Sequence, residues 1–359
     1  MKKIKSIEGI RTIVWVGIFV CHYIGAFIPD RSWILNKKAI SFICTGHGYL
    51  EVLFIVSGFV LSYKFFSKEC YELIPRDMVK RYFRLMPPVL FCELAVYVMM
   101  RLGLYKNAEV AELVGTMPTL GAFNQFRPDL IGCLKESLVV AYIRATNQYI
   151  GPLWTLRYEY IGALMILAAL FVFRKTPWRW LFYSAFLILL STYFNYLVLG
   201  MLLCDLYVNT RVSRILEENA VIRIIAIVSG YILQSMAEPR DGDKVSRIIF
   251  AVGITVFLLG VLTSKRLEKV LGNRIMLEGG KLGFSAYIVH WPVIETLSCG
   301  LVLLLYGGSI PYNYMIALIF IPTLLAVLII SKLISMYIEP IGLRITRIID
   351  RKWEKLVKK

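Results

Sequence analysis

The chain has 359 residues, of which 58% are apolar, and a mean hydropathy of +0.66. Because a soluble domain is usually about 45–50% apolar, this composition argues against a soluble protein and for a membrane protein. The net charge of +17 does not indicate nucleic-acid binding, since no soluble segment carries a basic stripe with interleaved aromatic residues. None of the seven cysteines belongs to a C-x-x-C pair, which argues against a metal or redox site.

Runs of roughly twenty apolar residues recur along the chain and predict an all-α, polytopic transmembrane bundle of about ten spans. A helix of that length crosses a hydrocarbon core about 30 Å thick. The runs are continuous and do not alternate as the strands of a barrel would. The predicted spans are 9–28, 48–66, 86–104, 151–173, 179–194, 195–209, 221–236, 247–263, 284–306 and 314–338.

The distribution of basic residues predicts that both termini are cytoplasmic. With the N-terminus inside, the inner segments hold 29 of the 41 Lys and Arg residues, which matches the excess of positive charge in cytoplasmic loops. We assign 1–345 to a membrane domain and 346–359 to a basic cytoplasmic tail. The longest outer connection, at about 105–150, exceeds most loops of compact domains, so we expect it to be functional.

Arg11 and His22 are the first ionisable residues placed where lipid disfavours charge. They are eleven residues apart, which is about three helical turns, so both face one side of the first span. An imidazole is suited to moving protons near neutral pH. The alternative is structural, with Arg11 anchoring to lipid phosphate and His22 making one interhelical hydrogen bond.

Further polar residues lie inside the predicted spans. Counting about 1.5 Å per residue from the span ends puts His22 and Glu159 at similar depths. We therefore expect them to meet as base and orienting carboxylate, with Ser57 at the same level. The structural alternatives are an ion pair of Glu159 with Arg157 and a packing role for Ser57 beside a glycine.

His290 precedes Pro292, and a histidine at a proline kink usually satisfies a freed carbonyl, so a structural role is favoured for it. Glu93 and Glu295 also lie within predicted spans, and the sequence identifies no partner for either.

A basic cluster lies on the inner side, just before Pro87 and Pro88. It consists of Arg76, Lys80, Arg81 and Arg84. Ordinary positive-inside charge is one interpretation. The other is a phosphate grip, because guanidinium groups bind phosphate in a bidentate manner.

Six segments together resemble the acyltransferase family 3 membrane proteins, in the same order along the chain. One is Arg11 followed after ten residues by His22, and another is the closing Ile338-Glu339-Pro340. The other four are Phe54-Ile55-Val56-Ser57-Gly58-Phe59, Arg81-Tyr82-Phe83-Arg84-Leu85-Met86-Pro87, Leu153-Trp154-Thr155-Leu156 with Glu159, and Tyr287-Ile288-Val289-His290-Trp291-Pro292. Departures from the family pattern occur at Glu8, Arg157, Tyr158 and Tyr160 and bear on substrate choice.

The resemblance implies that an acyl group, usually acetyl, passes from cytoplasmic acetyl-CoA or another acyl-CoA to a hydroxyl of an envelope glycan or glycolipid. It implies no bound cofactor and no metal. The expected location is the plasma membrane of a bacterial cell. The catalytic candidates are His22 and Glu159. The candidate substrate-binding residues are Arg11, Ser57, Arg81, Arg84, Trp154, Tyr287 and His290.

Two other functions fit a polytopic protein with polar residues in its spans. A glycolipid transporter would show internal symmetry and discontinuous helices, and the sequence shows neither. A family member without catalytic activity would have lost key residues, whereas Arg11, His22 and Glu159 are all present.

The charge distribution makes a topology prediction. A reporter that functions only in the cytoplasm should be active when it is fused after Lys359, because 29 of the 41 basic residues lie in the segments assigned inside. A paired reporter that functions only outside the cell serves as the control. Activity of that second reporter alone would overturn the assignment.

Overall fold

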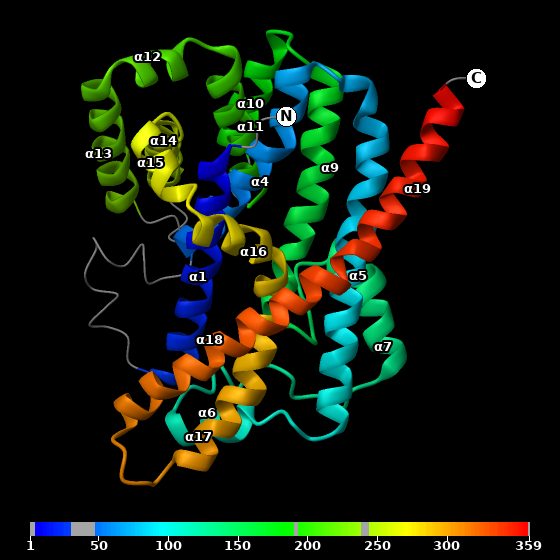
Figure 1. Ribbon diagram of the computed structural model, residues 1–359, viewed down its shortest axis with the longest axis vertical. Helices are drawn as coiled ribbons and strands as arrows, with labels where there is room; N and C mark the ends of the chain where they lie inside the picture. The colour runs from blue at the N-terminus through cyan, green and yellow to red at the C-terminus, as the bar shows by residue number, and fades with distance from the viewer. Residues whose placement is uncertain (1–3, 30–46, 190–192, 238–243, 358–359) are drawn as a thin grey trace. The chain divides into compact units, whose positions relative to one another are not determined.

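The computed structural model describes residues 4–29, 47–189, 193–237 and 244–357, and these form helices and no strands. They gather into two compact units (Figure 1). The first unit comprises 4–14, 47–78 and the described residues within 158–281, and the second comprises 15–29, 79–157 and 282–357. Four helices contribute residues to both units: α1 (Lys5–Phe27), α5 (Ile74–Arg101), α9 (Leu156–Phe173) and α16 (Arg274–Val293).

The remaining helices belong to one unit each. Those of the first unit are α4 (His47–Lys68), η1 (Tyr71–Leu73), α10 (Trp178–Leu189), α11 (Phe194–Asn209), α12 (Val212–Glu218), α13 (Ala220–Met236), α14 (Lys244–Leu262) and α15 (Lys265–Leu271). Those of the second unit are α6 (Asn107–Val114), α7 (Leu130–Lys135), η2 (Glu136–Val140), α8 (Ala141–Ile143), η3 (Gly151–Thr155), η4 (Ile294–Ser298), α17 (Cys299–Leu305), α18 (Tyr312–Tyr337) and α19 (Glu339–Val357).

The all-helical fold class is confirmed for the described residues, and each predicted span overlaps one or more helices. Residues 190–192 of the span predicted at 179–194 lie outside the described residues. Seven helices among these residues are long and apolar enough to cross a membrane. The pair α12 and α13, bent by 113°, would be an eighth span if it crosses as one. Helices α10 and α11 are shorter, so the count of ten spans and the orientation of the termini stay predictions. The proposed boundary at residue 345 falls inside α19, and that division also stays a prediction.

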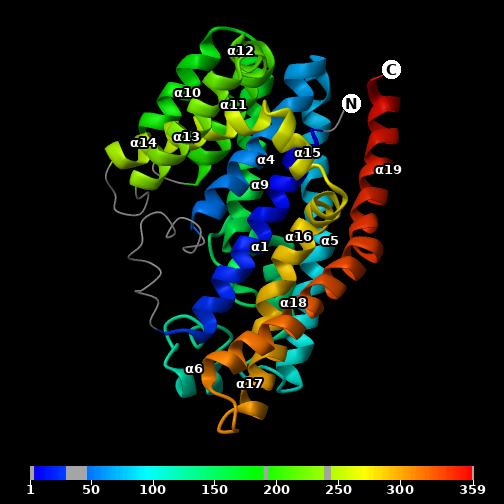
Figure 2. The same ribbon diagram turned by 60° about the vertical axis from the view of Figure 1, so that its left-hand side comes forward.

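Close helix crossings hold the first unit together. A Cβ atom at Gly58 of α4 would overlap the carbonyl of Leu197 on α11, and one at Gly200 of α11 would overlap the carbonyl of Ile55 on α4. Helices in membranes associate through such small residues because lipid provides little hydrophobic drive between them. Helices α13 and α14 also lie side by side in Figures 1 and 2, and Gly230 of α13 packs against the backbone of α14.

Hydrogen bonds from tyrosine hydroxyls to carbonyls tie the second unit together. Tyr23 of α1 donates to Ile316 O at 2.8 Å, and Tyr312 of α18 donates to Phe27 O at 2.6 Å. Phe19 of α1 stacks on Phe320 of α18 with ring centroids 5.4 Å apart. These contacts fix the C-terminal half of α1, which carries His22, against α18.

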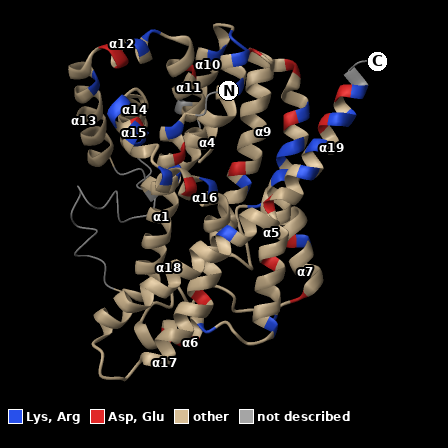
Figure 3. Cartoon of the chain, in the orientation of Figure 1, with Lys and Arg blue, Asp and Glu red and all other residues tan. Residues whose placement is uncertain are grey.

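Helix α19 carries charged residues along most of its length (Figure 3). It is also anchored within the second unit. Ser285 of α16 donates to Glu339 Oε1 at 2.5 Å, and Lys80 Nζ lies 2.9 Å from Asp350 Oδ1. Because these partners are 54 and 270 residues away in sequence, the Glu339-Pro340 segment and the helix after it belong to the folded unit.

The crossing of α4 and α11 makes a stability prediction. Gly58→Ala should lower the melting temperature of the detergent-solubilised protein, because an overpacked site costs about 1–3 kcal/mol. The matched control is Gly300→Ala in α17, where a Cβ would meet no atom within 4 Å. The close-crossing interpretation fails if both variants melt at the wild-type temperature.

Candidate active site

A pair of hydrogen-bonded histidines lies in the second unit. His22 Nδ1 on α1 lies 2.7 Å from His290 Nε2 on α16, and the two rings stack with centroids 5.0 Å apart and planes 16° apart. His290 is 1% exposed and His22 is half-buried. Residues that are 268 positions apart in the sequence therefore form one polar pair inside an apolar unit.

The surroundings of His290 set the positions of the protons in this pair. His290 Nδ1 lies 3.3 Å from the Ala286 carbonyl oxygen, which can only accept a hydrogen bond, so Nδ1 carries the proton of the neutral ring. His290 Nε2 then carries a lone pair and accepts a hydrogen bond from His22 Nδ1–H. In the neutral His22 ring the second lone pair is consequently on Nε2, the atom that can take up a proton.

This arrangement differs in part from the structural role expected of His290. Pro292 cannot donate to the carbonyl four residues before it, which is that of Ile288. His290 instead contacts Ala286 O and uses its other nitrogen for His22. The proline therefore accounts for the local shape of the helix but does not by itself account for the contacts of His290.

Aromatic rings from two segments surround the histidine pair. Trp291 meets His22 edge-on, with centroids 5.3 Å apart and planes 74° apart. Phe123, from the long connection between α6 and α7, meets Trp291 edge-on at 5.2 Å. The expected functional role of this connection stays a prediction, and one of its side chains packs on the tryptophan that contacts His22.

The Leu153-Trp154-Thr155-Leu156 segment and the Tyr287-to-Pro292 segment come together in the second unit. Tyr287 Oη on α16 donates to Pro152 O at 2.8 Å and lies 2.8 Å from Thr155 Oγ1 in η3. Tyr287 and Thr155 are buried, and Trp154 is half-buried. The Tyr287 hydroxyl therefore fixes η3 against α16, one helical turn from His290.

Three site residues predicted from the sequence lie in the first unit. Arg11 Nη1 lies 3.7 Å from Glu8 Oε1, and the Arg11 side chain is 34% exposed. Ser57 is buried beside Gly58, and Glu159 is half-buried. His22 belongs to the second unit, so its expected pairing with Glu159 stays a prediction.

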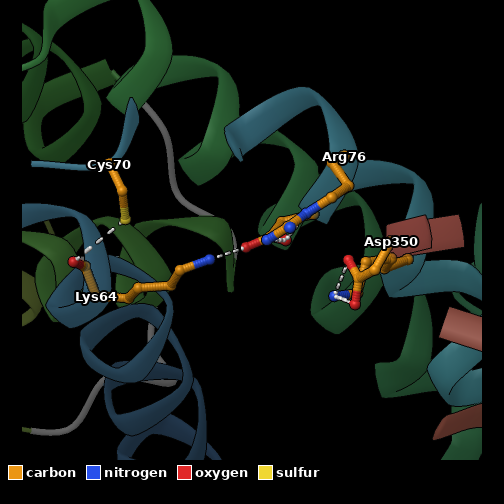
Figure 4. Close-up of polar contacts among 6 residues, drawn as sticks. Lys64, Cys70, Arg76 and Asp350 are labelled. Atoms are coloured by element: carbon orange, nitrogen blue, oxygen red, sulfur yellow. Dashed lines mark hydrogen bonds and ion pairs between the residues drawn. The ribbon is translucent and has the colours of Figure 1, made fainter. Parts of the chain in front are cut away.

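Two residues of the inner basic cluster, Arg76 and Lys80, form ion pairs with aspartates. Arg76 and Lys64 both contact the Asp77 carboxylate, at 3.1 and 2.6 Å, and Lys80 contacts Asp350 (Figure 4). Such pairs fit the ordinary-charge interpretation for Arg76 and Lys80. Arg81 is half-buried and Arg84 is exposed, and the phosphate-grip hypothesis stays a prediction for both.

The two unassigned glutamates have asparagine partners. Asn147 Nδ2 donates to Glu93 Oε1 at 2.7 Å, and Asn124 Nδ2 donates to Glu295 Oε2 at 3.1 Å. Both asparagines lie between α6 and η3. Asn124 also has a φ of +57°, a conformation that asparagine tolerates better than most residues. In the sequence, only its place as a polar residue in the long outer connection could have pointed to Asn124.

Another carboxyl group of the second unit lies outside the candidate spans. Glu136, in η2, is 7% exposed. Burial raises the pKa of the Glu136 carboxyl, and this effect is opposed by the backbone N–H of Gln148 and by Arg144.

The described residues contain no group of three or more His, Cys, Asp or Glu that could hold a metal.

The helices and motifs described above agree with comparisons to known proteins. An acyltransferase domain model matches residues 4–337. The chain therefore belongs to the acyltransferase family 3. It is also similar to the O-acetyltransferase PaAT-1 of Phomopsis amygdali, with 24% identity over 375 residues that cover 86% of this chain and 73% of the relative. No solved structure matches.

Family membership and this relative define the class of protein. It is an enzyme that transfers acyl groups, and its long apolar helices fit an integral membrane protein.

The contacts of Tyr287 make a prediction about the shape of the site. Tyr287→Phe should destabilise the protein by about 1 kcal/mol, because the buried Pro152 carbonyl and Thr155 hydroxyl each lose a partner. Thermal unfolding in detergent measures the loss, with Tyr314→Phe, at a residue that is 73% exposed, as the matched control. Equal melting temperatures for the two variants would contradict the tethering role of Tyr287.

Proposed function

We propose that the protein is an O-acyltransferase that moves an acyl group, acetyl in the simplest case, from a cytoplasmic acyl-CoA to a hydroxyl of an envelope carbohydrate or glycolipid. The observation that carries the proposal is the His22–His290 pair, inside a chain that belongs to an acyltransferase family. The name of the relative, an O-acetyltransferase, supports a hydroxyl acceptor. We place the enzyme in the plasma membrane of a bacterial cell.

In this proposal His22 removes the proton of the acceptor hydroxyl. His22 Nε2 takes that proton while the acceptor oxygen forms a bond to the acyl carbon, and the carbon–sulfur bond of the thioester then breaks. The CoA thiolate leaves and receives the proton back. The same imidazole nitrogen is also suited to carrying the acyl group briefly, in which case the acceptor attacks in a second step.

His290 acts as a positioning residue in this scheme. Because His290 Nε2 accepts from His22 Nδ1–H, it holds the His22 ring in the tautomer with a basic Nε2. Proton removal by Nε2 needs that tautomer, and other enzymes hold it with a carboxylate that accepts from Nδ1–H. We propose that Glu159 stabilises the imidazolium form of His22 after the proton has moved.

The donor phosphates are proposed to bind arginines near the cytoplasmic side. Arg11, Arg81 and Arg84 are the candidates, because a guanidinium matches phosphate oxygens in a bidentate manner. Ser57 and Trp154 are proposed to contact the substrates, as their motif positions imply. Tyr287 is proposed to act through η3, since its hydroxyl is engaged by Pro152 and Thr155.

Transfer of labelled acetyl from acetyl-CoA by the full-length enzyme in membranes tests this function. His22→Ala should reduce transfer by at least about a hundredfold, the contribution usual for a general base. His290→Ala should lower kcat by about tenfold to a hundredfold with little change in KM for acetyl-CoA, and should shift the pH profile. His290→Gln should recover part of the rate, because its amide oxygen can accept from His22 Nδ1–H.

An exposed residue outside the candidate site provides the control. Tyr314→Phe, at a side chain that is 73% exposed, should transfer acetyl at the wild-type rate. Normal transfer by His22→Ala would overturn the proposed function. An unchanged pH profile for His290→Ala, together with no rescue by glutamine, would reduce His290 to a packing residue.

A further inference from the structure

A cluster of buried polar atoms without hydrogen-bond partners surrounds Glu295 in the second unit. Among the described residues, no partner is present for Tyr105 Oη, Asn124 Oδ1 or Glu295 Oε1. All three atoms are inaccessible to solvent, and Glu295 itself is 0% exposed. We call Tyr105, Asn124 and Glu295 the Glu295 cluster.

Three contacts show that the cluster residues are neighbours. Asn124 Nδ2 donates to Glu295 Oε2 at 3.1 Å, so both side-chain amide atoms lie beside the carboxylate. The backbone N–H of Lys106 donates to Glu295 O at 3.3 Å, which places the preceding Tyr105, in the connection between α5 and α6, beside this turn of the helix. Burial and the Glu295 carboxylate raise the pKa of Tyr105 well above its usual value.

The helix that carries Glu295 is irregular at this position. Glu295 lies in η4, a π-helical segment that follows Pro292 directly after α16. Such segments are rare and occur frequently at functional sites, where they reposition a side chain and release backbone groups. Here the released group is the Glu295 carbonyl, which accepts from Lys106 of the connection after α5.

Aromatic side chains join the Glu295 cluster to the histidine pair. Trp291 is one helical turn before Glu295, its ring meets His22 at 5.3 Å, and its indole nitrogen approaches the carboxylate without reaching hydrogen-bond geometry. Phe123, the neighbour of Asn124, packs on the same indole at 5.2 Å. The indole of Trp291 therefore lies between the Glu295 cluster and His22.

Unsatisfied polar atoms in such a site need an explanation, because each buried one costs free energy. The missing partner must donate hydrogen bonds, since a carboxylate and an amide oxygen only accept, and it can also accept one if the tyrosine hydroxyl donates to it. Sugar hydroxyl groups have this property, and the apolar faces of a sugar ring suit flanking aromatic rings. A cation is a weaker match, because the described residues hold no metal-binding group.

We propose that the Glu295 cluster binds hydroxyl groups of a sugar acceptor and presents one of them to His22. This inference rests on the proposed function and names the part of the site that recognises the acceptor. Glu295 and Asn124 accept hydrogen bonds from the sugar, and Tyr105 bonds to a further hydroxyl. Trp291 covers the ring and separates these contacts from the reacting hydroxyl at His22.

The test uses the full-length enzyme in phosphatidylcholine proteoliposomes with or without monoglucosyl diacylglycerol, supplied with labelled acetyl-CoA. Two rates are measured: transfer of label to the glucolipid, and hydrolysis of acetyl-CoA in its absence. Glu295→Gln and Tyr105→Phe should each raise KM for the glucolipid by about tenfold, the factor that matches the loss of one hydrogen bond. KM for acetyl-CoA and the hydrolysis rate should stay at wild-type values.

Two measurements distinguish loss of glucolipid binding from loss of the fold. Tyr105→Phe removes only a hydroxyl that has no partner among the described residues, so its melting temperature should equal or exceed that of the wild type. Glu93→Gln is the matched control, because Glu93 is also fully buried, bonded to an asparagine and left with one unpartnered oxygen. It should leave KM for the glucolipid unchanged.

The alternative occupant of the cluster is ordered water. Lower melting temperatures for Tyr105→Phe and Glu295→Gln with an unchanged KM for the glucolipid would establish water and overturn the proposal. Acetyl-CoA turnover that needs His22 but never acetylates the glucolipid would overturn this inference alone. No turnover of acetyl-CoA under any condition would count against the proposed function itself.

Discussion

The bilayer provides no hydrogen-bond partners, so every polar group inside it must find one within the protein. This constraint accounts for much of the second unit. Hydroxyl groups donate to carbonyls of other segments from Tyr23, Tyr312 and Tyr287, and the Ser285 hydroxyl donates to Glu339. The segments that these bonds join are far apart in the sequence, so the bonds also determine which helices become neighbours.

The same constraint explains why the histidine pair is informative. A lone buried histidine usually needs only one carbonyl, and His290 has such a carbonyl in Ala286. The second ring nitrogen of His290, Nε2, lies within hydrogen-bond distance of the His22 imidazole, so two titratable side chains are in contact in an apolar region. Trp291 packs edge-on against His22, and Phe123 packs edge-on against Trp291. The carbonyl of Ala286 determines the tautomer of the pair.

Polar groups without a partner stand out for the opposite reason. Glu93 and Glu295 each satisfy one carboxylate oxygen with an asparagine amide and leave the other without a partner among the described residues. Of these two, only Glu295 lies beside Trp291, the ring that also contacts His22. This proximity to the histidine pair separates the proposed binding site from a carboxylate that is simply buried.

The sequence by itself determined the class of structure, its approximate helices and the family. Apolar runs of bilayer length predict helices because lipid leaves the backbone no alternative, and each predicted run overlaps one or more helices of the described residues. It also identified His22, His290 and Glu295 as polar residues in apolar surroundings. These inferences depend on local composition and spacing, which the linear sequence contains.

Only the tertiary structure decided which residues meet. The partner of His22 is 268 residues away, and the asparagine that bonds to Glu295 is 171 residues away. Spacing along one helix constrains depth and face but not the neighbouring helix. Depth therefore suggested Glu159 as a partner of His22, which stays a prediction, but it could not identify His290 as a neighbour. The Gly58 contact with Leu197 has the same origin, because glycine in a sequence does not indicate which backbone approaches it.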